Sequence, residues 1–330
     1  MAYITLNKNN FFYNLDIIAK QTKGRDKIAL VLKDNAYGHG LIEIATLAQE
    51  YGIKKAVVQT HEEAEKIAAF FEYVLVLADI PQNADSKIRY TINTLSSINK
   101  FPKDTLVELK VNTGMNRNGI EMDELESAFE AINTQGLVLE AVFTHHGCAD
   151  ELNDFYDMQN SNFQKVKEAS EKRLRFHSCN SAALFRNDNF SEDMARVGIA
   201  AYGCMELPSA ISEVKLKPVL SLYADKISSR TIKSGCCVGY GAIFTTQKES
   251  VVSNYDFGYG DGFLRACSNR YKTADGVELV GRISMDNSSF ISDEESLCIF
   301  SDAREVSKVA GTISYEILTS LKSELKRTIV

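Results

Sequence analysis

The chain lacks three features that would assign it quickly: a basic run, an extended apolar run and a metal-ligand spacing. Its 330 residues carry a formal net charge of −7, which argues against nucleic acid as a partner. No apolar stretch reaches the roughly 18 residues of a membrane span. The opening MAYITLNKNNFFYNL also lacks the charged-then-apolar layout of a signal peptide. We therefore expect neither a membrane nor a nucleic-acid partner.

The seven cysteines and five histidines are scattered. Only Cys236 and Cys237 are close, and adjacent cysteines are not a metal-ligand spacing. His145 and His146 would point to opposite faces if they lie on a strand. An odd number of scattered cysteines is typical of free thiols in a reducing compartment. We expect no bound metal and a cytoplasmic location.

Short apolar runs alternate with helical patterns through about the first 200 residues, which predicts parallel strands with crossover helices. The predicted strands are Ile28–Lys33, Ala56–Gln59, Tyr73–Leu77, Tyr90–Ile92, Leu106–Val111, Leu139–Thr144, Arg175–Cys179 and Ala195–Ile199. The predicted helices between them include Leu41–Tyr51, His61–Phe71, Met122–Thr134 and Asp154–Lys172. Eight such strands can close a (β/α)8 barrel. Periodicity alone does not separate a barrel from an open parallel sheet.

The pattern changes near Lys217-Pro218, beyond which short alternating strands and turns predict a β domain. The predicted strands there are Leu220–Ile227, Cys236–Tyr240, Val251–Phe257, Val277–Ile283 and Ser288–Ile291. At the other end, Ala2–Leu6 is predicted as a separate strand before a helix at Phe11–Lys23. We expect an α/β chain with a (β/α)8 TIM-type barrel at 7–217. A mainly-β domain at 218–330 would follow, joined by the N-terminal strand at 1–6.

The most informative segment is the end of the first barrel strand, IALVLKDNAYGHG at 28–40. A lysine at the carboxyl end of a barrel strand, here Lys33, is well placed to form a Schiff base. Glycines on either side of His39 allow the backbone to approach a ligand closely. Most strand-end lysines are solvated surface charges, so the whole string carries the argument. It resembles the pyridoxal-phosphate motif of the alanine racemase family, whose lysine carries the cofactor.

The resemblance extends over nearly the whole chain, and the next motif is LKVNTGMNRNG at 109–119. It implies that Arg117 donates to the phenolic oxygen of pyridoxal phosphate and contacts the substrate. It also implies that Lys110 is carbamylated, which would place an anion beside that arginine. Asn112 departs from the aspartate that the family often has. Without the resemblance, these residues read as a surface arginine and a lysine paired with a carboxylate.

Three further motifs end predicted barrel strands: VFTHHGCADE at 142–151, HSCNSAA at 177–183 and MARVGIAAYG at 194–203. The resemblance implies that His145 stacks on the cofactor ring and that Ser181 binds its phosphate. It implies that Arg196 binds the pyridine nitrogen, while the amides of Gly198 and Ile199 hold the phosphate. A guanidinium disfavours protonation of that nitrogen, which should suppress side reactions such as transamination. The plain alternatives are a core histidine, an N-cap serine and a salt-bridging arginine.

The last motifs lie in the predicted β domain: VGYGA at 238–242, GYGDG at 258–262, GRISMD at 281–286 and TISYE at 312–316. By themselves they are strand ends with glycine turns. The resemblance implies that Tyr240 is a second catalytic base contributed across a dimer interface, and that the Met285 amide binds the substrate carboxylate. The remaining implied roles are phosphate donors at Tyr37 and Tyr315 and an entrance lined by Asp150, Tyr259 and Arg282.

These motifs imply a two-base alanine racemase that uses pyridoxal phosphate, acts as a homodimer with shared sites and supplies D-alanine for peptidoglycan. A serine or broader-specificity racemase stays open, because a small pocket separates methyl from hydroxymethyl only weakly. A pyridoxal-phosphate amino-acid decarboxylase is a second alternative, although those chains are usually longer and place an acid where this one has Arg196. A non-catalytic cofactor carrier is a third, but it would lack the β domain and Tyr240.

Overall fold

Eight parallel strands form a single sheet in the computed structural model, which describes residues 2–187 and 189–330. Their order around the sheet is β8-β7-β6-β5-β4-β3-β2-β9. The strands are β2 (Ile28–Val31), β3 (Lys55–Val58), β4 (Tyr73–Val76), β5 (Ile88–Ile92), β6 (Leu106–Lys110), β7 (Val138–Phe143), β8 (Arg175–His177) and β9 (Ala195–Val197). All eight coincide with predicted strands, with small shifts at their ends.

The sheet curls into a nearly closed barrel, which answers the question that periodicity left open. No ladder pairs β8 with β9 in the part of the chain that the structure describes. Backbone hydrogen bonds link the two edges instead, from Asp193 N to Phe176 O at 3.2 Å and from Arg196 N to Cys179 O at 2.9 Å. The predicted (β/α)8 barrel is therefore confirmed.

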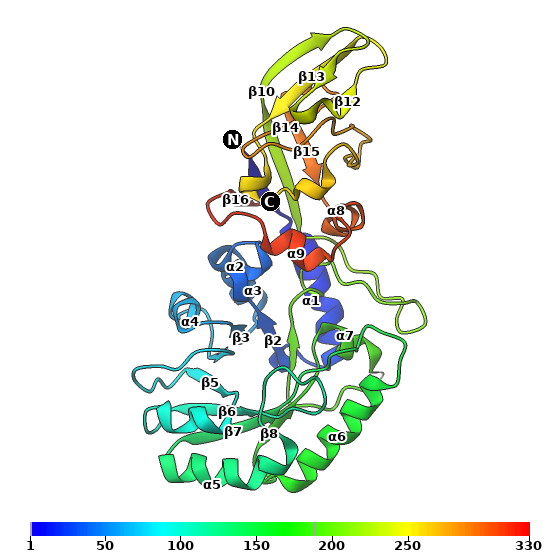
Figure 1. The fold of residues 1–330 in the computed structure, drawn as a ribbon. Coiled ribbons are helices and arrows are strands. Elements are labelled where there is room, and N and C mark those ends of the chain that lie inside the picture. The colour runs from blue at the N-terminus through cyan, green and yellow to red at the C-terminus, as the bar shows by residue number, and fades with distance from the viewer. Residues whose placement is uncertain (1, 188) are drawn as a thin grey trace.

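Helices cover the outside of the barrel (Figure 1). They are α1 (Lys8–Thr22), α3 (Leu41–Tyr51), α4 (His61–Ile67), α5 (Leu125–Gln135), α6 (Phe155–Ala169) and α7 (Ser181–Arg186). Short 3-10 turns occur at η1 (Arg25–Lys27), η2 (Leu95–Lys100), η3 (Met122–Glu124), η4 (Tyr240–Ala242), η5 (Tyr259–Asp261) and η6 (Arg265–Cys267). The predicted helix at Leu41–Tyr51 has the same bounds as α3.

The barrel interior is apolar on one side and charged on the other. Ala29, Val31, Val57, Tyr73, Leu75 and Met194 pack as one cluster, separate from the main core beneath the helices. Successive side chains of a strand alternate between faces. On β6, Val107 and Leu109 belong to the helix-side core, so Glu108 and Lys110 face inward. This charged side of the barrel carries most of the predicted site.

The second part of the molecule is an elongated β domain that also holds both chain termini (Figure 1). Its sheet has the order β14-β13-β10-β1-β16, and β15 also pairs with β10. The strands are β1 (Tyr3–Leu6), β10 (Leu220–Ile232), β13 (Ser250–Tyr255), β14 (Ser288–Phe290), β15 (Ser296–Phe300) and β16 (Lys326–Ile329), with a small hairpin of β11 (Cys237–Val238) and β12 (Phe244–Thr245). We keep 7–217 and 218–330 as a proposed division into domains.

The β domain differs from its prediction in several places. β12, β15 and β16 were not among the strands named, and β10 continues to Ile232, past its predicted end at Ile227. Val277–Ile283 was expected to be a strand, but it makes only isolated bridges, such as Leu279 with Phe290. Two helices were not predicted, α8 (Ala303–Ala310) and α9 (Ser314–Thr319). They have eight and six residues, which is too short for a helical period to be separated from a strand pattern with certainty. In Figure 1, α9 lies at the junction with the barrel, close to α2.

Candidate active site

Lys33 begins a short helical turn, α2 (Lys33–Tyr37), whose hand is the reverse of an ordinary helix. Asp34, Asn35, Ala36 and Tyr37 have φ values of 54°, 54°, 52° and 50°. Left-handed helical backbone costs roughly 1–2 kcal/mol per residue for L-amino acids, and only Asn and Asp tolerate it well. The sequence predicted a loop here, but not its conformation. Contacts from elsewhere must hold this strained turn in place.

Those contacts come from three separate parts of the chain. Glu63, at the start of α4, accepts the Asp34 N–H at 2.8 Å and caps its own helix with the other carboxylate oxygen. Arg327 on β16 donates to the Gly38 carbonyl through Nε at 3.0 Å and Nη2 at 2.9 Å. Gly38 packs so closely on α9 that an added Cβ would lie 1.9 Å from Leu318 O. The β domain therefore helps to fix the loop that carries Lys33.

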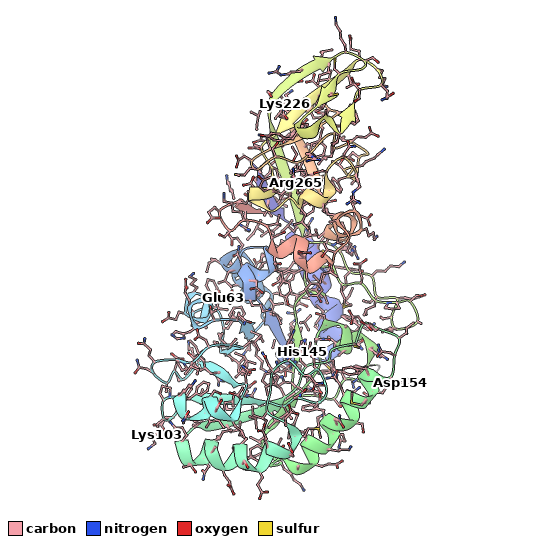
Figure 2. The ribbon with its side chains drawn as sticks, in the orientation of Figure 1. Glu63, Lys103, His145, Asp154, Lys226 and Arg265 are labelled. Carbon is pink, nitrogen blue, oxygen red and sulfur yellow. The ribbon has the colours of Figure 1, made fainter. Side chains whose placement is uncertain are left out.

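The Lys33 side chain is 32% exposed, and its Nζ lies 3.1 Å from Asp34 Oδ2. It is accessible from the carboxyl end of β2, as a lysine that attaches a ligand must be. Figure 2 shows His145 in the barrel half of the molecule and Lys226 and Arg265 in the β domain.

Hydroxyl and amide donors gather close to this loop. Ser181 Oγ accepts the Gly198 N–H at 3.2 Å and the Ala200 N–H at 3.4 Å, which leaves its own hydroxyl proton to donate. A Cβ on Gly198 would lie 3.0 Å from the Tyr37 hydroxyl, and the ring of Tyr315 is 5.7 Å from that of Tyr37. Burial raises the pKa of both tyrosines, so both keep their protons and remain donors. This donor set suits a phosphate group.

Two further details concern a predicted phosphate contact, Ile199, and a predicted entrance residue, Asp150. The Ile199 N–H has no hydrogen-bond acceptor within residues 2–187 and 189–330, so it is available to a ligand. Asp150 is exposed on the barrel side, and its charge adds to burial in raising the pKa of Tyr315. Asp150 is therefore near enough to Tyr315 for its charge to be felt there.

Arg196 is 5% exposed, and its guanidinium is held on one side by protein acceptors. Nη2 donates to Thr144 O at 2.7 Å and to Ser178 O at 3.2 Å. Nη1 donates to His177, through a short contact with Nδ1 and a 3.3 Å contact with the carbonyl. Nε is the remaining nitrogen, and no acceptor among the described residues takes its proton. Nε is not among the fully buried polar atoms without a partner, so its N–H is open to the site and could meet a ligand nitrogen.

Burial and neighbouring positive charges lower the pKa of both His145 and Lys110. The Nδ1 of His145 is 3.5 Å from Arg196 Nη2, and burial together with that guanidinium lowers its pKa well below the usual value. Burial, then the charges of Arg196 and Arg117, lower the pKa of Lys110 to about 8. Within the described part of the chain, no carboxylate forms an ion pair with Lys110. The plain alternative, a lysine paired with a carboxylate, is therefore not what the structure shows.

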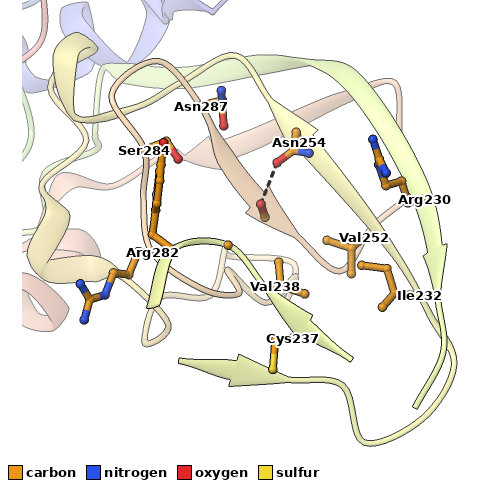
Figure 3. A pocket seen from close by; sticks show the side chains of 12 residues that line it. Arg230, Ile232, Cys237, Val238, Val252, Asn254, Arg282, Ser284 and Asn287 are labelled. Atoms are coloured by element: carbon orange, nitrogen blue, oxygen red, sulfur yellow. Dashed lines mark hydrogen bonds between the residues drawn. The ribbon is translucent and has the colours of Figure 1, made fainter. Parts of the chain in front are cut away.

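The predicted residues of the β domain form a second group. Tyr240 is 68% exposed in the hairpin between β11 and β12, and Met285 is 56% exposed. The guanidinium carbon of Arg282 lies 3.3 Å from where a Cβ on Gly241 would be. Tyr259, 43% exposed, is next to Gly260, whose N–H donates to Met285 O at 2.8 Å. Figure 3 shows the hollow of about 350 Å³ beside this group, with Arg282 and Ser284 on its wall.

The two groups are not joined within one chain. Figure 1 shows β12 near the tip of the β domain, whereas α2 lies at the junction with the barrel. Lys33, Tyr37, His145, Ser181 and Arg196 therefore gather at the barrel, and Tyr240 lies far from them. The hollow in Figure 3, which Tyr240 and Arg282 help to line, is therefore separate from the site around Lys33.

Two family profiles match the chain. The profile of the alanine racemase N-terminal domain matches residues 6–206, and that of the C-terminal domain matches residues 219–329. The chain belongs to the alanine racemase family. An alanine racemase of Nitratiruptor sp. is 43% identical over 99% of both chains, and one of Campylobacter jejuni is 38% identical over the full length of both.

Solved structures show the same fold. Alanine racemase from Bacillus anthracis with bound L-Ala-P is 26% identical, with a TM-score of 0.89 over 100% of this chain and 95% of that one. The enzyme from Bartonella henselae, with covalently bound pyridoxal phosphate, is 25% identical with a TM-score of 0.87 over 100% and 99%. A histidine racemase from Leuconostoc mesenteroides is equally close, at 25% and 0.88 over 100% and 98%. Racemases named for two different amino acids therefore share this architecture.

Two predicted absences can be examined only in the described residues. None of their helices has the length and apolarity that crossing a membrane requires. They also hold no cluster of three or more acidic, histidine or cysteine side chains that could bind a metal ion.

Sequence reasoning assigned no role to Glu108, Arg175 or His177, although they form a chain of contacts that leads to Arg196. His177 contacts Arg196, Glu108 contacts His177, and Arg175 contacts Glu108. A usable signal was present. Polar residues two positions apart on a buried barrel strand, as in Glu108-Leu-Lys110 and Arg175-Phe-His177, share the inward face. Such pairs are rare among apolar barrel strands and mark a polar interior.

Proposed function

We propose that the chain interconverts L-alanine and D-alanine with pyridoxal phosphate, and so supplies D-alanine for peptidoglycan in the cytoplasm. The observation that carries the proposal is the donor set around Lys33. Hydroxyls suited to phosphate stand on one side, and the unpaired Nε–H of the buried Arg196 lies within the same barrel end. Family membership over the full length supports the same activity.

The residues fit the cofactor in kind and in place. Tyr37, Ser181, Tyr315 and the amides of Gly198 and Ile199 would hold the phosphate. Gly198 is needed there, because any side chain would meet the Tyr37 hydroxyl. The other proposed contacts are Lys33 for covalent attachment, Arg196 for the pyridine nitrogen, Arg117 for the phenolic oxygen and His145 against the ring. When bound, the cofactor supplies a conjugated ring that withdraws electrons from the substrate Cα.

Racemisation requires a proton to leave one face of Cα and return to the other. A single base on one side cannot easily do both. Lys33 Nζ would exchange the proton on the D face, and the Tyr240 hydroxyl would exchange it on the L face. The Met285 N–H has no acceptor within the described residues and is free to hold the substrate carboxylate, with Arg117 as a second donor.

The position of Tyr240 favours a homodimer with shared sites. Its side chain is 68% exposed and lies far from Lys33 of the same chain (Figure 1). A two-base site therefore needs Tyr240 from a second copy, which would dock its β-domain tip against the barrel mouth. Asp150 on the barrel, with Tyr259 and Arg282 on the β domain, would then line the entrance.

Three alternative functions compete with this proposal. The histidine racemase of the same fold favours a test of substrate range, because serine or other amino acids could also be turned over. A decarboxylase is disfavoured by the buried Arg196, and a carrier by the β domain with Tyr240.

The direct test is turnover of several D-amino acids by the purified protein, with its absorbance spectrum recorded. We expect a band near about 420 nm from the lysine-bound cofactor and fastest turnover with D-alanine. No band, or no racemisation of any amino acid, would refute the proposal. Faster turnover of D-serine than of D-alanine would move the assignment to the broader-specificity alternative.

A further inference from the structure

We propose that Glu108 is a positioning residue, which fixes the tautomer of His177 and thereby turns Arg196 toward the cofactor nitrogen. This inference rests on the proposed function, and it assigns a role to a residue that would never touch the cofactor or the substrate.

Glu108 lies on β6 inside the barrel and is 0% exposed. One carboxylate oxygen accepts the Tyr73 hydroxyl at 2.6 Å and Arg175 Nη2 at 3.1 Å. The other oxygen is 2.9 Å from His177 Nε2. Burial alone would raise the pKa of Glu108, but the hydrogen bonds from His177 and Tyr73 and the charge of Arg175 lower it below its usual value. Glu108 is therefore ionised and only accepts hydrogen bonds.

The two nitrogens of His177 face partners of opposite kind. Nε2 faces the carboxylate of Glu108, which only accepts, so Nε2 must carry a proton. Nδ1 is in short contact with Arg196 Nη1, which only donates, so Nδ1 must keep its lone pair. Burial lowers the pKa of His177 against the effect of Glu108, which keeps the ring neutral. The ring is also stacked on Phe143, at 4.7 Å and 12°.

The tautomer of His177 decides what Arg196 can do. With a lone pair on Nδ1, His177 accepts from Nη1, while Thr144 O and Ser178 O accept from Nη2. The guanidinium is then held at both terminal nitrogens, and Nε–H is left for the ligand. With a proton on Nδ1, two N–H groups would face each other in a buried site, and Arg196 would have to turn away.

Replacing Glu108 by glutamine forces that change. Tyr73 and Arg175 both donate to the same oxygen, so the amide oxygen of the glutamine would stay with them. The amide NH2 would then face His177 Nε2, which could only accept. The proton of the neutral imidazole would move to Nδ1, against Arg196. The substitution thus keeps the shape of the side chain and reverses the direction of its hydrogen bond with His177 Nε2.

Glu140 offers a matched control. It accepts from Arg89 Nε at 3.0 Å and from Arg175 Nη2 at 2.8 Å, but no hydrogen bond joins it to His177. Glu140→Gln therefore removes one negative charge from the same polar cluster without touching the tautomer. Thermal melting of both variants would establish that each is folded.

The test reads the tautomer directly, by nitrogen-15 NMR of the apoprotein labelled in its five histidines. The His177 signals are assigned by their loss in His177→Asn. We expect a neutral ring protonated on Nε2 in the wild type and in Glu140→Gln between about pH 7 and pH 9, and on Nδ1 in Glu108→Gln. A charged or Nδ1-protonated ring in the wild type would overturn the proposal, as would an unchanged tautomer in Glu108→Gln. The wild-type spectrum decides even if that variant does not fold.

A second readout follows the reaction. With Arg196 misplaced, Glu108→Gln should racemise alanine roughly 100-fold more slowly. It should also form more pyruvate per racemisation, because amino-group transfer from alanine to the cofactor is no longer suppressed. Glu140→Gln should keep the wild-type ratio. An unchanged ratio in Glu108→Gln would contradict the proposal. A wild type that does not racemise alanine would instead refute the proposed function, and the apoprotein spectrum would still report on Glu108.

Discussion

The two candidate bases occupy opposite surroundings. Lys33 begins a left-handed turn that Glu63, Arg327 and the α9 backbone hold in a strained conformation. Tyr240 projects from a two-stranded hairpin and is 68% exposed. The first base is positioned by its own chain, including the β domain, whereas the second is left without a partner there. The proposed two-base reaction would therefore need Tyr240 from another copy of the chain.

The largest expected effect is at Lys33. Lys33→Ala should lose covalent attachment of the cofactor and with it racemisation, because no other lysine lies at the end of β2. Borohydride reduction of the wild type followed by peptide mapping should mark Lys33. A label on a different lysine would show that the strained turn does not carry the attachment.

Tyr240→Phe should slow racemisation by roughly 10²–10⁴-fold, the loss of one general base, without weakening cofactor binding. Exchange of the Cα proton of D-alanine with deuterated solvent should continue, since Lys33 still reaches that face. Exchange from L-alanine should stop. Equal exchange from both enantiomers would mean that one base serves both faces.

Glu63→Gln tests the contacts that hold Lys33. The carboxylate accepts Asp34 N with one oxygen and Gln59 N with the other, and an amide can keep only one of these roles. We expect a loss of about 1–2 kcal/mol in the free energy of unfolding, and slower borohydride labelling of Lys33 at equal cofactor concentration. Glu62→Gln on the same helix, whose partner is the exposed Lys66, is the control and should change neither. Unchanged stability and labelling in Glu63→Gln would show that the turn does not depend on the hydrogen bonds of Glu63.

The smallest effect concerns Lys110, which we predict to be carbamylated and to position Arg117. Its pKa of about 8 means that the neutral amine, the form that reacts with carbon dioxide, increases as the pH rises toward 8 and beyond. Intact-mass analysis in bicarbonate should show one added carbon dioxide, more at pH 8.5 than at pH 7. Lys110→Ala should abolish the addition. An unmodified amine throughout that range would reject the prediction.

The sequence predicted the barrel well because its parallel strands are buried on both sides and read as short apolar runs. β2, β4 and β7 all lie within a residue or two of their predicted bounds. It could not predict the left-handed turn. Asp34 and Asn35 tolerate that backbone, but Ala36 and Tyr37 adopt it only because distant residues compensate. The nearest of those, Glu63, is 29 residues away in sequence, and Arg327 is 289 residues from Gly38.

The candidate site divides in the same way. The family motifs named Ser181, Arg196 and Tyr37. In the structure Ser181 and Tyr37 both lie beside Gly198, two residues from Arg196 in sequence. The motifs named Tyr240 as well, but they carry no information on how far it lies from Lys33. The polar cluster of Glu108 and His177 behind Arg196 depends on three-dimensional contacts between strands. Only the alternation along each strand hinted at it.

We predict that each active site takes Lys33 from one copy of the chain and Tyr240 from another. Co-expression of a Lys33→Ala chain with a Tyr240→Ala chain, each carrying its own affinity tag, would give hybrid dimers alongside the two inactive parents. Each hybrid would contain one intact site, so a random mixture should recover about a quarter of the wild-type activity. Purification through both tags should enrich that activity. Hybrid dimers confirmed by mass that remain as inactive as the parents would contradict the shared site.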